Sequence, residues 1–227
     1  MTRRTYVLSL GGSLIVPNDV NYKFIKLFKA LIIKKIKNNC RFIIVCGGGG
    51  LNRRYNEAAK MIKTMTNEEL DWIGIYTTRY NAEFIRIMFG KFAHNEIAID
   101  PNKKFSTKKA IIIGAGYKPG WSSDYDAVYL AKTYGSRSVV NLSNIDYAYD
   151  KDPNKFSDAV PIEEMSWKNF RKIVGNKWEP RMNKPFDPIA SREAQKLGLR
   201  VTILNGKNLD NLEKYLDDKN YIGTNIY

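Results

Sequence analysis

Histidine and cysteine are scarce in this sequence of 227 residues, which holds one histidine and two cysteines. A structural zinc site needs four Cys or His ligands, and a Ser-His-Asp triad needs a well-placed histidine. His94 lies near the end of an expected helix, and we assign it no catalytic role. Cys40 and Cys46 border one apolar segment, so each is expected to be a small buried side chain. Zinc chemistry, a disulfide framework and triad hydrolysis are therefore all disfavoured.

Long apolar segments are also missing. No run reaches 18 apolar residues, so no transmembrane helix is expected. The apolar stretch after Arg3 and Arg4 spans six residues, too few for the core of a signal peptide. No linker rich in proline, glycine or serine divides the chain. We expect one domain over residues 1–227, a cytoplasmic location and no membrane partner.

The charge is strongly positive. Lysine and arginine number 37 against 23 acidic residues, which gives a net charge of +14. Such an excess suggests nucleic acid or phosphate-bearing ligands, but a lysine-biased proteome would produce it as well. The basic residues are scattered, and no dense basic tract with interleaved aromatics appears. Nucleic acid is therefore an improbable partner.

Expected strands and helices alternate along the whole chain. Short apolar strands are expected at Tyr6–Leu10, Arg41–Cys46, Glu96–Ile99, Ala110–Ile113, Ser138–Leu142 and Val201–Leu204. Helical periodicity is found at Tyr22–Lys37, Leu51–Met65, Glu68–Phe89, Ser122–Tyr134, Glu163–Val174, Pro188–Leu197 and Leu209–Leu216. This alternation predicts an α/β fold, a three-layer αβα sandwich around a mainly parallel sheet.

Three glycine-rich breaks follow expected strands, at Gly11-Gly12-Ser13, Gly47–Gly50 and Gly114–Gly120. The carboxyl ends of parallel strands share one sheet edge, where ligands of such folds bind. Glycine lets backbone N–H groups approach a phosphate, although glycine also ends strands for turn reasons alone. The breaks match neither the GxxxxGK(S/T) nor the GxGxxG pattern. An anion site is expected, but an ordinary P-loop enzyme and a classical dehydrogenase are not.

Two arginines, Arg53 and Arg54, stand in the first turns of the helix after Gly47–Gly50. Cations there oppose the helix dipole, so their presence makes sense when a bound anion lies between them and the backbone. The alternative is a pair of solvated surface arginines.

An acidic, tyrosine-containing segment follows the strand Ser138–Leu142. Residues 143–153 hold three aspartates and two tyrosines. Tyrosine could stack on an adenine, and aspartate could serve Mg²⁺ or a ribose. A polar turn ended by Asp-Pro is an equally good interpretation.

Taken in order, the motifs resemble a known family. They are Gly11-Gly12-Ser13-Leu14, Val45-Cys46-Gly47-Gly48-Gly49, Arg53-Arg54-Tyr55, Asp71-Trp72-Ile73-Gly74-Ile75, Pro119-Gly120-Trp121-Ser122-Ser123-Asp124, Asn144-Ile145-Asp146 with Tyr149 and Asp152-Pro153, and Phe186-Asp187-Pro188-Ile189-Ala190. In this order and spacing the set resembles the amino acid kinase family, most closely its uridine monophosphate kinases of archaeal type. The resemblance implies the reaction ATP + UMP → ADP + UDP, with Mg²⁺ accompanying ATP. It also implies that the N-terminal half binds the acceptor, that the C-terminal half binds ATP, and that the protein is a hexamer built from dimers.

Carried over by position, the resemblance also implies roles for individual residues. Arg53, with Gly47 and Gly48, would hold the acceptor phosphate, and Asp71 would bind the UMP ribose. The rest of the acceptor site would comprise Gly74, Gly120, Ser122, Ser123 and Asp124. The ATP side would comprise Ser9, Gly11, Gly12, Ser13, Gly49, Asn144, Asp146, Tyr149 and Asp152. Asp187 would orient basic groups around the transition state.

The sequence departs from the family pattern at two positions. Ser9 stands where many members have a lysine, and Tyr147 stands where a glycine is usual. Lys184, three residues before Asp187, is our candidate for the replacement cation. A kinase of another small phosphate, such as isopentenyl phosphate, is the alternative enzyme, but its usual histidine after the glycine loop is missing from residues 50–55. A non-catalytic nucleotide-binding or oxoanion-binding protein of the same fold is the other alternative.

Overall fold

A seven-stranded sheet with helices on both faces forms the molecule, as the computed structural model shows for residues 3–151, 153, 155–175 and 184–227. The strand order is β3-β2-β1-β4-β8-β9-β7, and every pair is parallel except the antiparallel pair β8–β9. The strands are β1 (Arg4–Leu10), β2 (Cys40–Cys46), β3 (Ile111–Gly114), β4 (Ser138–Ser143), β7 (Glu164–Met165), β8 (Arg200–Asn205) and β9 (Thr224–Ile226), and a separate hairpin joins β5 (Ala148–Tyr149) to β6 (Pro161–Ile162). The expected three-layer fold with a mainly parallel sheet is confirmed.

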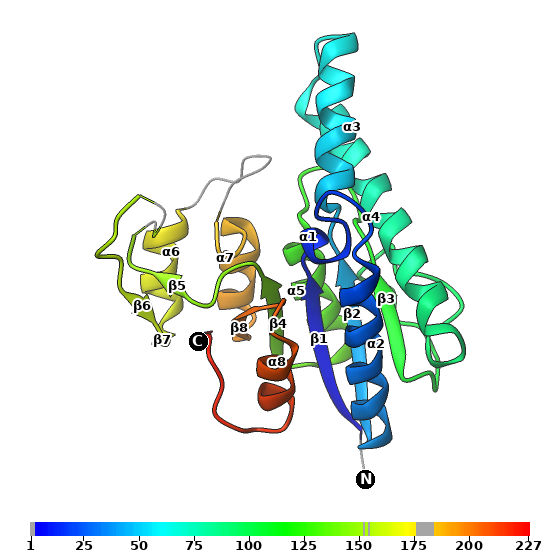
Figure 1. Cartoon of the computed structure of the whole chain (residues 1–227), viewed down its shortest axis with the longest axis vertical. Helices are drawn as coiled ribbons and strands as arrows, with labels where there is room; N and C mark the ends of the chain where they lie inside the picture. Colours follow the sequence, from blue (N-terminus) through cyan, green and yellow to red (C-terminus); the bar gives the residue numbers. More distant parts are fainter. Residues whose placement is uncertain (1–2, 152, 154, 176–183) are drawn as a thin grey trace.

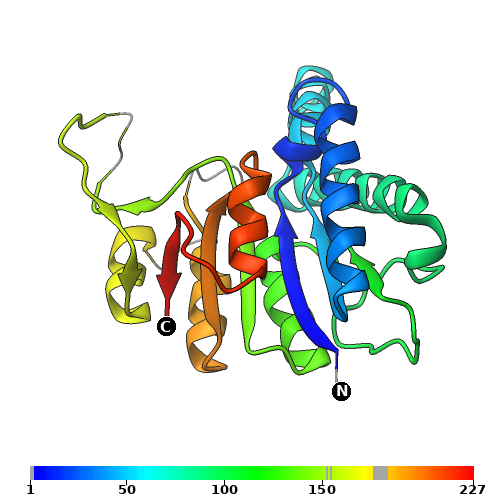
Figure 2. The same ribbon diagram turned by 60° about the horizontal axis from the view of Figure 1, so that its bottom comes forward.

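Successive residues of the central strands point into two separate cores. Tyr6, Leu8 and Leu10 of β1 pack on one side, while Val7 packs on the other. The first core lies under α1 (Gly12–Ile15), α2 (Tyr22–Lys37), α4 (Asn67–Phe89) and α8 (Leu209–Leu216). The second lies under α5 (Ser123–Tyr134), α6 (Trp167–Val174) and α7 (Pro188–Lys196), as the two sides of the sheet in Figure 2 show. Because both faces are covered, the inner strands are mainly apolar, and Ser9, Asn141 and Thr202 are their buried polar residues.

The connections after β1 and β2 build a projecting structure at one edge of the sheet. β1 runs into the single turn of α1, and β2 runs into α3 (Gly49–Ile62). α3 and the first half of α4 extend beyond the sheet as a helical hairpin (Figure 1). Thr66 begins α4 with a capping box, since its hydroxyl accepts the Glu69 N–H and the Glu69 carboxylate accepts the Thr66 N–H. The glycine-rich breaks thus lie between the sheet edge and this hairpin.

The expected strand Glu96–Ile99 does not form. Only Ala98 makes a bridge, to Gly114, through the bonds Ala98 N–H to Ile113 O and Ala115 N–H to Ala98 O. Pro101, which has no N–H, follows within three residues, and the chain turns there instead of extending the sheet.

Two expected helices begin or end elsewhere. The helix expected over Glu163–Val174 starts at Trp167, because Glu164 and Met165 pair with β9 and Ser166 caps the helix through the Asn169 N–H. The helix expected to reach Met65 ends at Ile62, just before the cap of α4. The start of α6 is thus set by the capping hydroxyl of Ser166.

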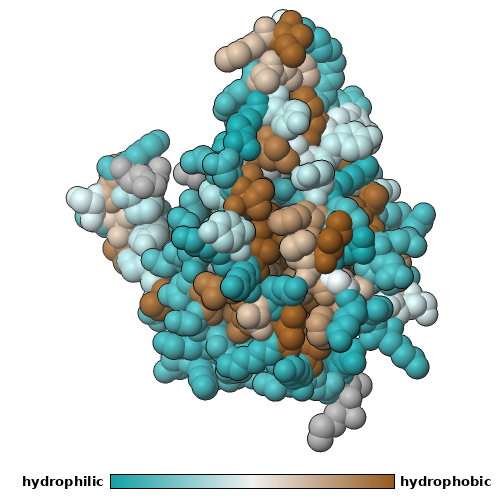
Figure 3. Space-filling model, turned by 45° about the vertical axis from the view of Figure 1, so that its right-hand side comes forward, coloured by the Kyte–Doolittle hydropathy of each residue, from teal (hydrophilic) through white to brown (hydrophobic). Residues whose placement is uncertain are grey.

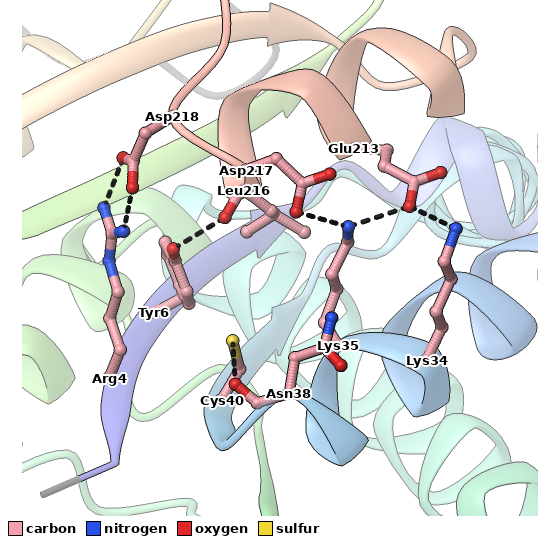
Figure 4. Close-up of polar contacts among 10 residues, drawn as sticks. All are labelled: Arg4, Tyr6, Lys34, Lys35, Asn38, Cys40, Glu213, Leu216, Asp217 and Asp218. Atoms are coloured by element: carbon pink, nitrogen blue, oxygen red, sulfur yellow. Dashed lines mark hydrogen bonds and ion pairs between the residues drawn. The ribbon is translucent and has the colours of Figure 1, made fainter. Parts of the chain in front are cut away.

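A buried lysine joins α2 to the end of α8 (Figure 4). The Nζ of Lys35 lies 2.8 Å from Glu213 and 2.7 Å from Asp217, and its side chain is only 2% exposed. The neighbouring Lys34 also pairs with Glu213, at 2.7 Å, but its side chain is 64% exposed. Hydrogen bonds from Lys34 and Lys35 lower the pKa of Glu213 to about 2. Ion pairs therefore link α2 to the end of α8, and water screens the attraction within them only partly, because Lys35 is buried.

We expect Lys35→Met to lower the free energy of unfolding by roughly 2–3 kcal/mol at pH 7, because it leaves Asp217 without its partner. Lys34→Met is the matched control and should cost less than about 1 kcal/mol. The pKa of the Glu213 carboxyl is lower in the folded chain than the ordinary 4.5. The ionised carboxylate therefore stabilises the fold fully above pH 4.5, and this stabilisation is lost as the pH falls toward 2. Urea unfolding at pH 7 and pH 3 measures the effect of each substitution and its pH dependence. Equal losses of unfolding free energy in Lys35→Met and Lys34→Met would contradict the view that the buried lysine carries the stabilisation.

Apolar side chains also gather on the outer surface of the hairpin and along the side formed by α2 and α4 (Figure 3). Tyr76, Tyr80 and Ile87 of α4 are between 54% and 71% exposed, and Met61 and Ile62 at the end of α3 exceed 80%. Exposed apolar side chains gathered in this way are typical of a surface that contacts another protein chain, and the homo-oligomer expected from the sequence stays a prediction. None of the helices described is long and apolar enough to cross a membrane.

Candidate phosphoryl-transfer site

Two glycine breaks meet backbone to backbone at the carboxyl ends of β1 and β2. A Cβ on Gly12 would lie 2.1 Å from the Gly49 nitrogen, and one on Gly47 would lie 2.6 Å from the Gly12 nitrogen. The Gly47 N–H donates to the Leu10 carbonyl at 3.0 Å, which ties the two breaks together. Only glycine permits this approach, and the contact fixes the two loops against each other.

Four backbone N–H groups at this junction are left for a ligand. Those of Gly12, Ser13, Gly48 and Gly49 make no hydrogen bond within the part of the chain that the structure describes. The buried amide of Asn81 holds the loop from behind, since its Nδ2 donates to the carbonyls of Gly47 and Gly48 at 2.8 and 3.1 Å. With the carbonyls bound to Asn81, the junction presents donors, which is the arrangement that binds phosphate oxygens.

Arg53 lies beside the junction, as the position of its motif predicts. Its guanidinium donates to the Pro17 carbonyl at 2.9 Å and to the Ser13 hydroxyl at 3.4 Å, and the residue is exposed. Arg54 points elsewhere and lies 3.9 Å from the exposed Asp19. The two arginines are therefore not equivalent, and only Arg53 is held next to the glycine loops.

A cavity of about 550 Å³ opens from the junction between α3, α4 and the start of α5. Five residues of the expected acceptor site line it, namely Gly48, Asp71, Gly74, Ser122 and Ser123. A sixth, Gly120, donates its N–H to the Asp71 carboxylate at 2.8 Å, and burial raises the pKa of that carboxyl. The structure thus brings together residues that are up to 75 positions apart in the sequence.

Ser9, Asp124 and Asp187 form a second polar group behind the junction. The Ser9 hydroxyl donates to one Asp124 oxygen at 2.8 Å, and the Asp187 N–H donates to the other at 3.2 Å. Burial, with the nearby Asp187 charge, raises the pKa of Asp124 to about 6. Asp124 was expected at the acceptor, but it does not line the described cavity and contacts Ser9 instead.

Asp187 begins α7, and its Oδ1 accepts the Ala190 N–H at 2.6 Å. Burial raises the pKa of this carboxyl too. No described lysine or arginine forms an ion pair with it, so the expected orientation of basic groups by Asp187 is not seen in these contacts.

The chemistry of these two carboxylates fits Mg²⁺ carried in by a nucleotide. No cluster of three or more possible ligand residues occurs among the described residues. Mg²⁺ bound to phosphates commonly takes only one or two carboxylates and keeps several waters. The Oδ2 of Asp187 is buried and makes no hydrogen bond of good geometry. A cation bound nearby would offset the cost of burying the Asp124 and Asp187 carboxylates.

The residues expected on the ATP side lie at the same sheet edge. Ser143 ends β4 and Asn144 follows it, and the Ser143 hydroxyl lies 3.4 Å from the Oδ1 of Asn144. Asp146 accepts a hydrogen bond from the Asn205 amide, at the end of the neighbouring β8, at 3.0 Å. Tyr149 belongs to β5, and Asp152 lies outside the described residues. The structure places Asn144 and Asp146 near the ends of two adjacent strands, and their ligand role stays a prediction.

Lys184 is not brought to the glycine loops by any described contact. It is exposed, and its Nζ lies 3.5 Å from the Ile173 carbonyl of α6. The described contacts therefore do not support Lys184 as the cation that replaces the usual lysine at the Ser9 position.

Several cavity residues were missed by sequence reasoning. They are Asn52, Asn56 and Lys60 on α3 and Asn67, Leu70 and Thr78 on α4. Two further lining residues, Gly116 and Trp121, lie in the loop before α5 and belong to segments that the sequence analysis had singled out. The spacing of four in Asn52, Asn56 and Lys60 was a usable signal, because it places them on one face of a helix. The loop is fixed by α4, where Thr78 accepts the Gly116 N–H and Arg79 donates to the carbonyls of Gly116 and Tyr117.

Comparison with known proteins gives consistent matches along the chain. A profile of the amino acid kinase family matches residues 4–205. A uridylate kinase from Staphylothermus marinus is 30% identical over 225 residues, covering 98% of each chain. One from Methanoculleus marisnigri is 27% identical over 221 residues, covering 96% of this chain and 93% of that protein. The crystal structure of a uridylate kinase from Archaeoglobus fulgidus matches with a TM-score of 0.82 at 25% identity, over 99% of this chain and 100% of that one.

Proposed function

Because this chain belongs to the amino acid kinase family, we propose that it transfers the γ-phosphoryl group of ATP to the phosphate of UMP, giving ADP and UDP. The observation that carries the proposal is the junction of the two glycine loops, whose four free N–H groups adjoin the cavity that contains Asp71. A phosphate placed at the junction leaves the cavity for the nucleoside attached to it. The relatives named as uridylate kinases favour UMP as the acceptor.

Transfer between two phosphates needs positioning and charge neutralisation more than proton removal, because the acceptor oxygen is already ionised. The junction N–H groups would bind the oxygens of the transferring group, and Arg53 would bind the acceptor phosphate through its planar fork. Ser9, whose one hydroxyl proton is donated to Asp124, would act by fixing the orientation of that carboxylate. Mg²⁺, held through Asp124 or Asp187, would supply positive charge to the ATP phosphates.

The two halves of the chain would serve different substrates. The cavity is built from α3, α4 and the start of α5, and we propose it for the acceptor. Asn144 and Asp146, at the ends of β4 and β8, would contact ATP together with Tyr149 and Asp152. ATP would then approach the junction from the side opposite the cavity.

A coupled assay of ADP release, over a panel of nucleoside monophosphates and isopentenyl phosphate, tests this function. UMP is expected to give the highest kcat/KM, and omission of Mg²⁺ should abolish turnover. If the protein bound nucleotides but released no ADP with any acceptor in the panel, the result would contradict kinase activity and favour a non-catalytic binding protein. A higher kcat/KM for isopentenyl phosphate than for UMP would be consistent with kinase activity but would contradict UMP as the acceptor.

A further inference from the structure

Asn52 of α3 lines the cavity close to the glycine junction. A Cβ on Gly48 would lie 2.8 Å from the Cβ of Asn52, and one on Gly74 of α4 would lie 3.4 Å from its Nδ2. Asp71 precedes Gly74 by three residues on the same face of α4 and also lines the cavity. The Asn52 amide therefore stands between the junction and the level of Asp71, about one helical turn from each.

The amide of Asn52 is held in one orientation by Asn56, on the next turn of α3. The Nδ2 of Asn56 donates to the Oδ1 of Asn52 at 3.0 Å, and Asn56 is only 5% exposed. The Oδ1 of Asn56 is buried without a donor in the described part of the chain, a cost that a needed orientation of Asn52 would explain. The Nδ2 of Asn52 makes no hydrogen bond among the described residues and is not fully buried, so a ligand in the cavity can reach it.

The facing wall of the cavity supplies a hydrogen-bond acceptor. Asp71 accepts the Gly120 N–H with one carboxylate oxygen, and its other oxygen makes no hydrogen bond within the residues described. A hydroxyl group both donates and accepts, so a carboxylate and an amide nitrogen on opposite walls can satisfy it together. An ionised phosphate oxygen can only accept, and an alkyl chain does neither. Asn52 and Asp71 are therefore complementary to a hydroxyl group on the part of the ligand next to its phosphate.

We propose that Asn52 binds a sugar hydroxyl of the acceptor and makes the enzyme select acceptors whose phosphate is attached to a hydroxylated sugar. The inference rests on the proposed transfer to a nucleoside monophosphate, and it names a residue that the family motifs do not include. A donor left without a partner in the cavity costs binding free energy, so a substrate that lacks the hydroxyl is bound less tightly. Asn56 acts through Asn52 and is a positioning residue.

Substrates that lack one hydroxyl test the contact. Asn52→Ala should lower kcat/KM for UMP roughly 5- to 50-fold, the range expected when a hydrogen-bonding group is left unpaired. With 2′-deoxy-UMP or 3′-deoxy-UMP, whichever lacks the bound hydroxyl, the wild type and Asn52→Ala should agree within about twofold. An equal loss for all three substrates would place the effect at the phosphate or in the fold, and no loss for UMP would show that there is no contact. Either result would overturn the proposal.

The positioning role of Asn56 has its own variant. Asn56→Leu keeps the side chain's approximate volume but has no group to donate to Asn52, so it should reduce the preference for UMP over the deoxy substrate as Asn52→Ala does. The double variant should lose no more than Asn52→Ala alone, because both substitutions remove one interaction. The exposed Glu57 lies on the same helix, and Glu57→Gln is the control that should keep the preference. A loss of stability in Asn56→Leu with an unchanged preference would contradict the positioning role.

Titration calorimetry measures the same selectivity without turnover. The wild type could release no ADP yet bind UMP more tightly than one deoxy substrate, with the difference abolished in Asn52→Ala. That result would overturn the proposed kinase activity and leave the hydroxyl contact standing. ADP release with the same preference in the wild type and Asn52→Ala would instead overturn the contact and leave the kinase activity standing.

Discussion

Arg53→Ala is expected to lower kcat/KM for UMP about 10- to 100-fold, while the KM for ATP changes little. The guanidinium is held at the junction by the Pro17 carbonyl and the Ser13 hydroxyl, next to the free N–H groups of the glycine loops. Its removal deletes a charge-assisted hydrogen bond to the acceptor phosphate, which accounts for the expected size of the effect. Steady-state kinetics with each substrate varied in turn measure the change.

Arg54→Ala is the matched control for that experiment. Arg54 is the next residue on α3, but it points toward Asp19, and both side chains are more than half exposed. Its replacement should leave kcat/KM for UMP within a few fold. If the two variants lost activity equally, the effect would reflect net charge near the site, and Arg53 would lose its assigned role.

Gly12→Ala is expected to reduce kcat by at least about 100-fold, because the new Cβ would lie 2.1 Å from the Gly49 nitrogen and 2.6 Å from the Gly47 carbonyl carbon. The two loops would have to separate by about an ångström, a displacement large enough to cost that much in phosphoryl transfer. The same overlap should lower the free energy of unfolding by about 1–3 kcal/mol. ADP release and urea unfolding measure the two effects separately.

Gly74→Ala is the control for Gly12→Ala, since it adds the same methyl group at a glycine outside the junction. Its Cβ would meet only side-chain atoms of Asn52, the nearest at 3.4 Å, and the residue lies inside α4. Alanine favours a helix interior over glycine, so stability should stay equal or rise by up to about 1 kcal/mol. Unchanged kcat in Gly12→Ala would show that the junction does not position the transferring group.

Burial pattern determines which elements could be predicted from sequence. β1, β2, β4 and β8 are apolar segments buried on both faces, and periodicity finds such strands readily. β9 has the sequence Thr224-Asn225-Ile226 and carries no such pattern. Contacts with distant residues hold it, including the antiparallel pairing with β8 and the bond from the Ala148 N–H to the Thr224 hydroxyl. Contacts of this kind leave no local signal in the chain.

The same distinction applies to the site. The glycine junction was predictable, because each glycine break follows an apolar strand. The sequence analysis assigned no role to Asn52 and Lys60, because their spacing marks one face of a helix but does not tell whether a cavity or water lies against that face. Asp124 was assigned to the acceptor, but its partner Ser9 is 115 residues away, and only the packing of α5 against β1 brings the two together. Pairings over such distances depend on the completed fold.

The central position of β1 has a consequence for biosynthesis. β1 pairs with β2 on one side, but on the other side Val7 pairs with Val139, about 130 residues later. At the usual pace of a ribosome, of order 5–20 residues per second, that edge of β1 remains open for about 7–26 seconds after β1 is made. An unpaired apolar strand can associate with other chains, so this interval is when the nascent protein is most exposed to aggregation and most dependent on chaperones.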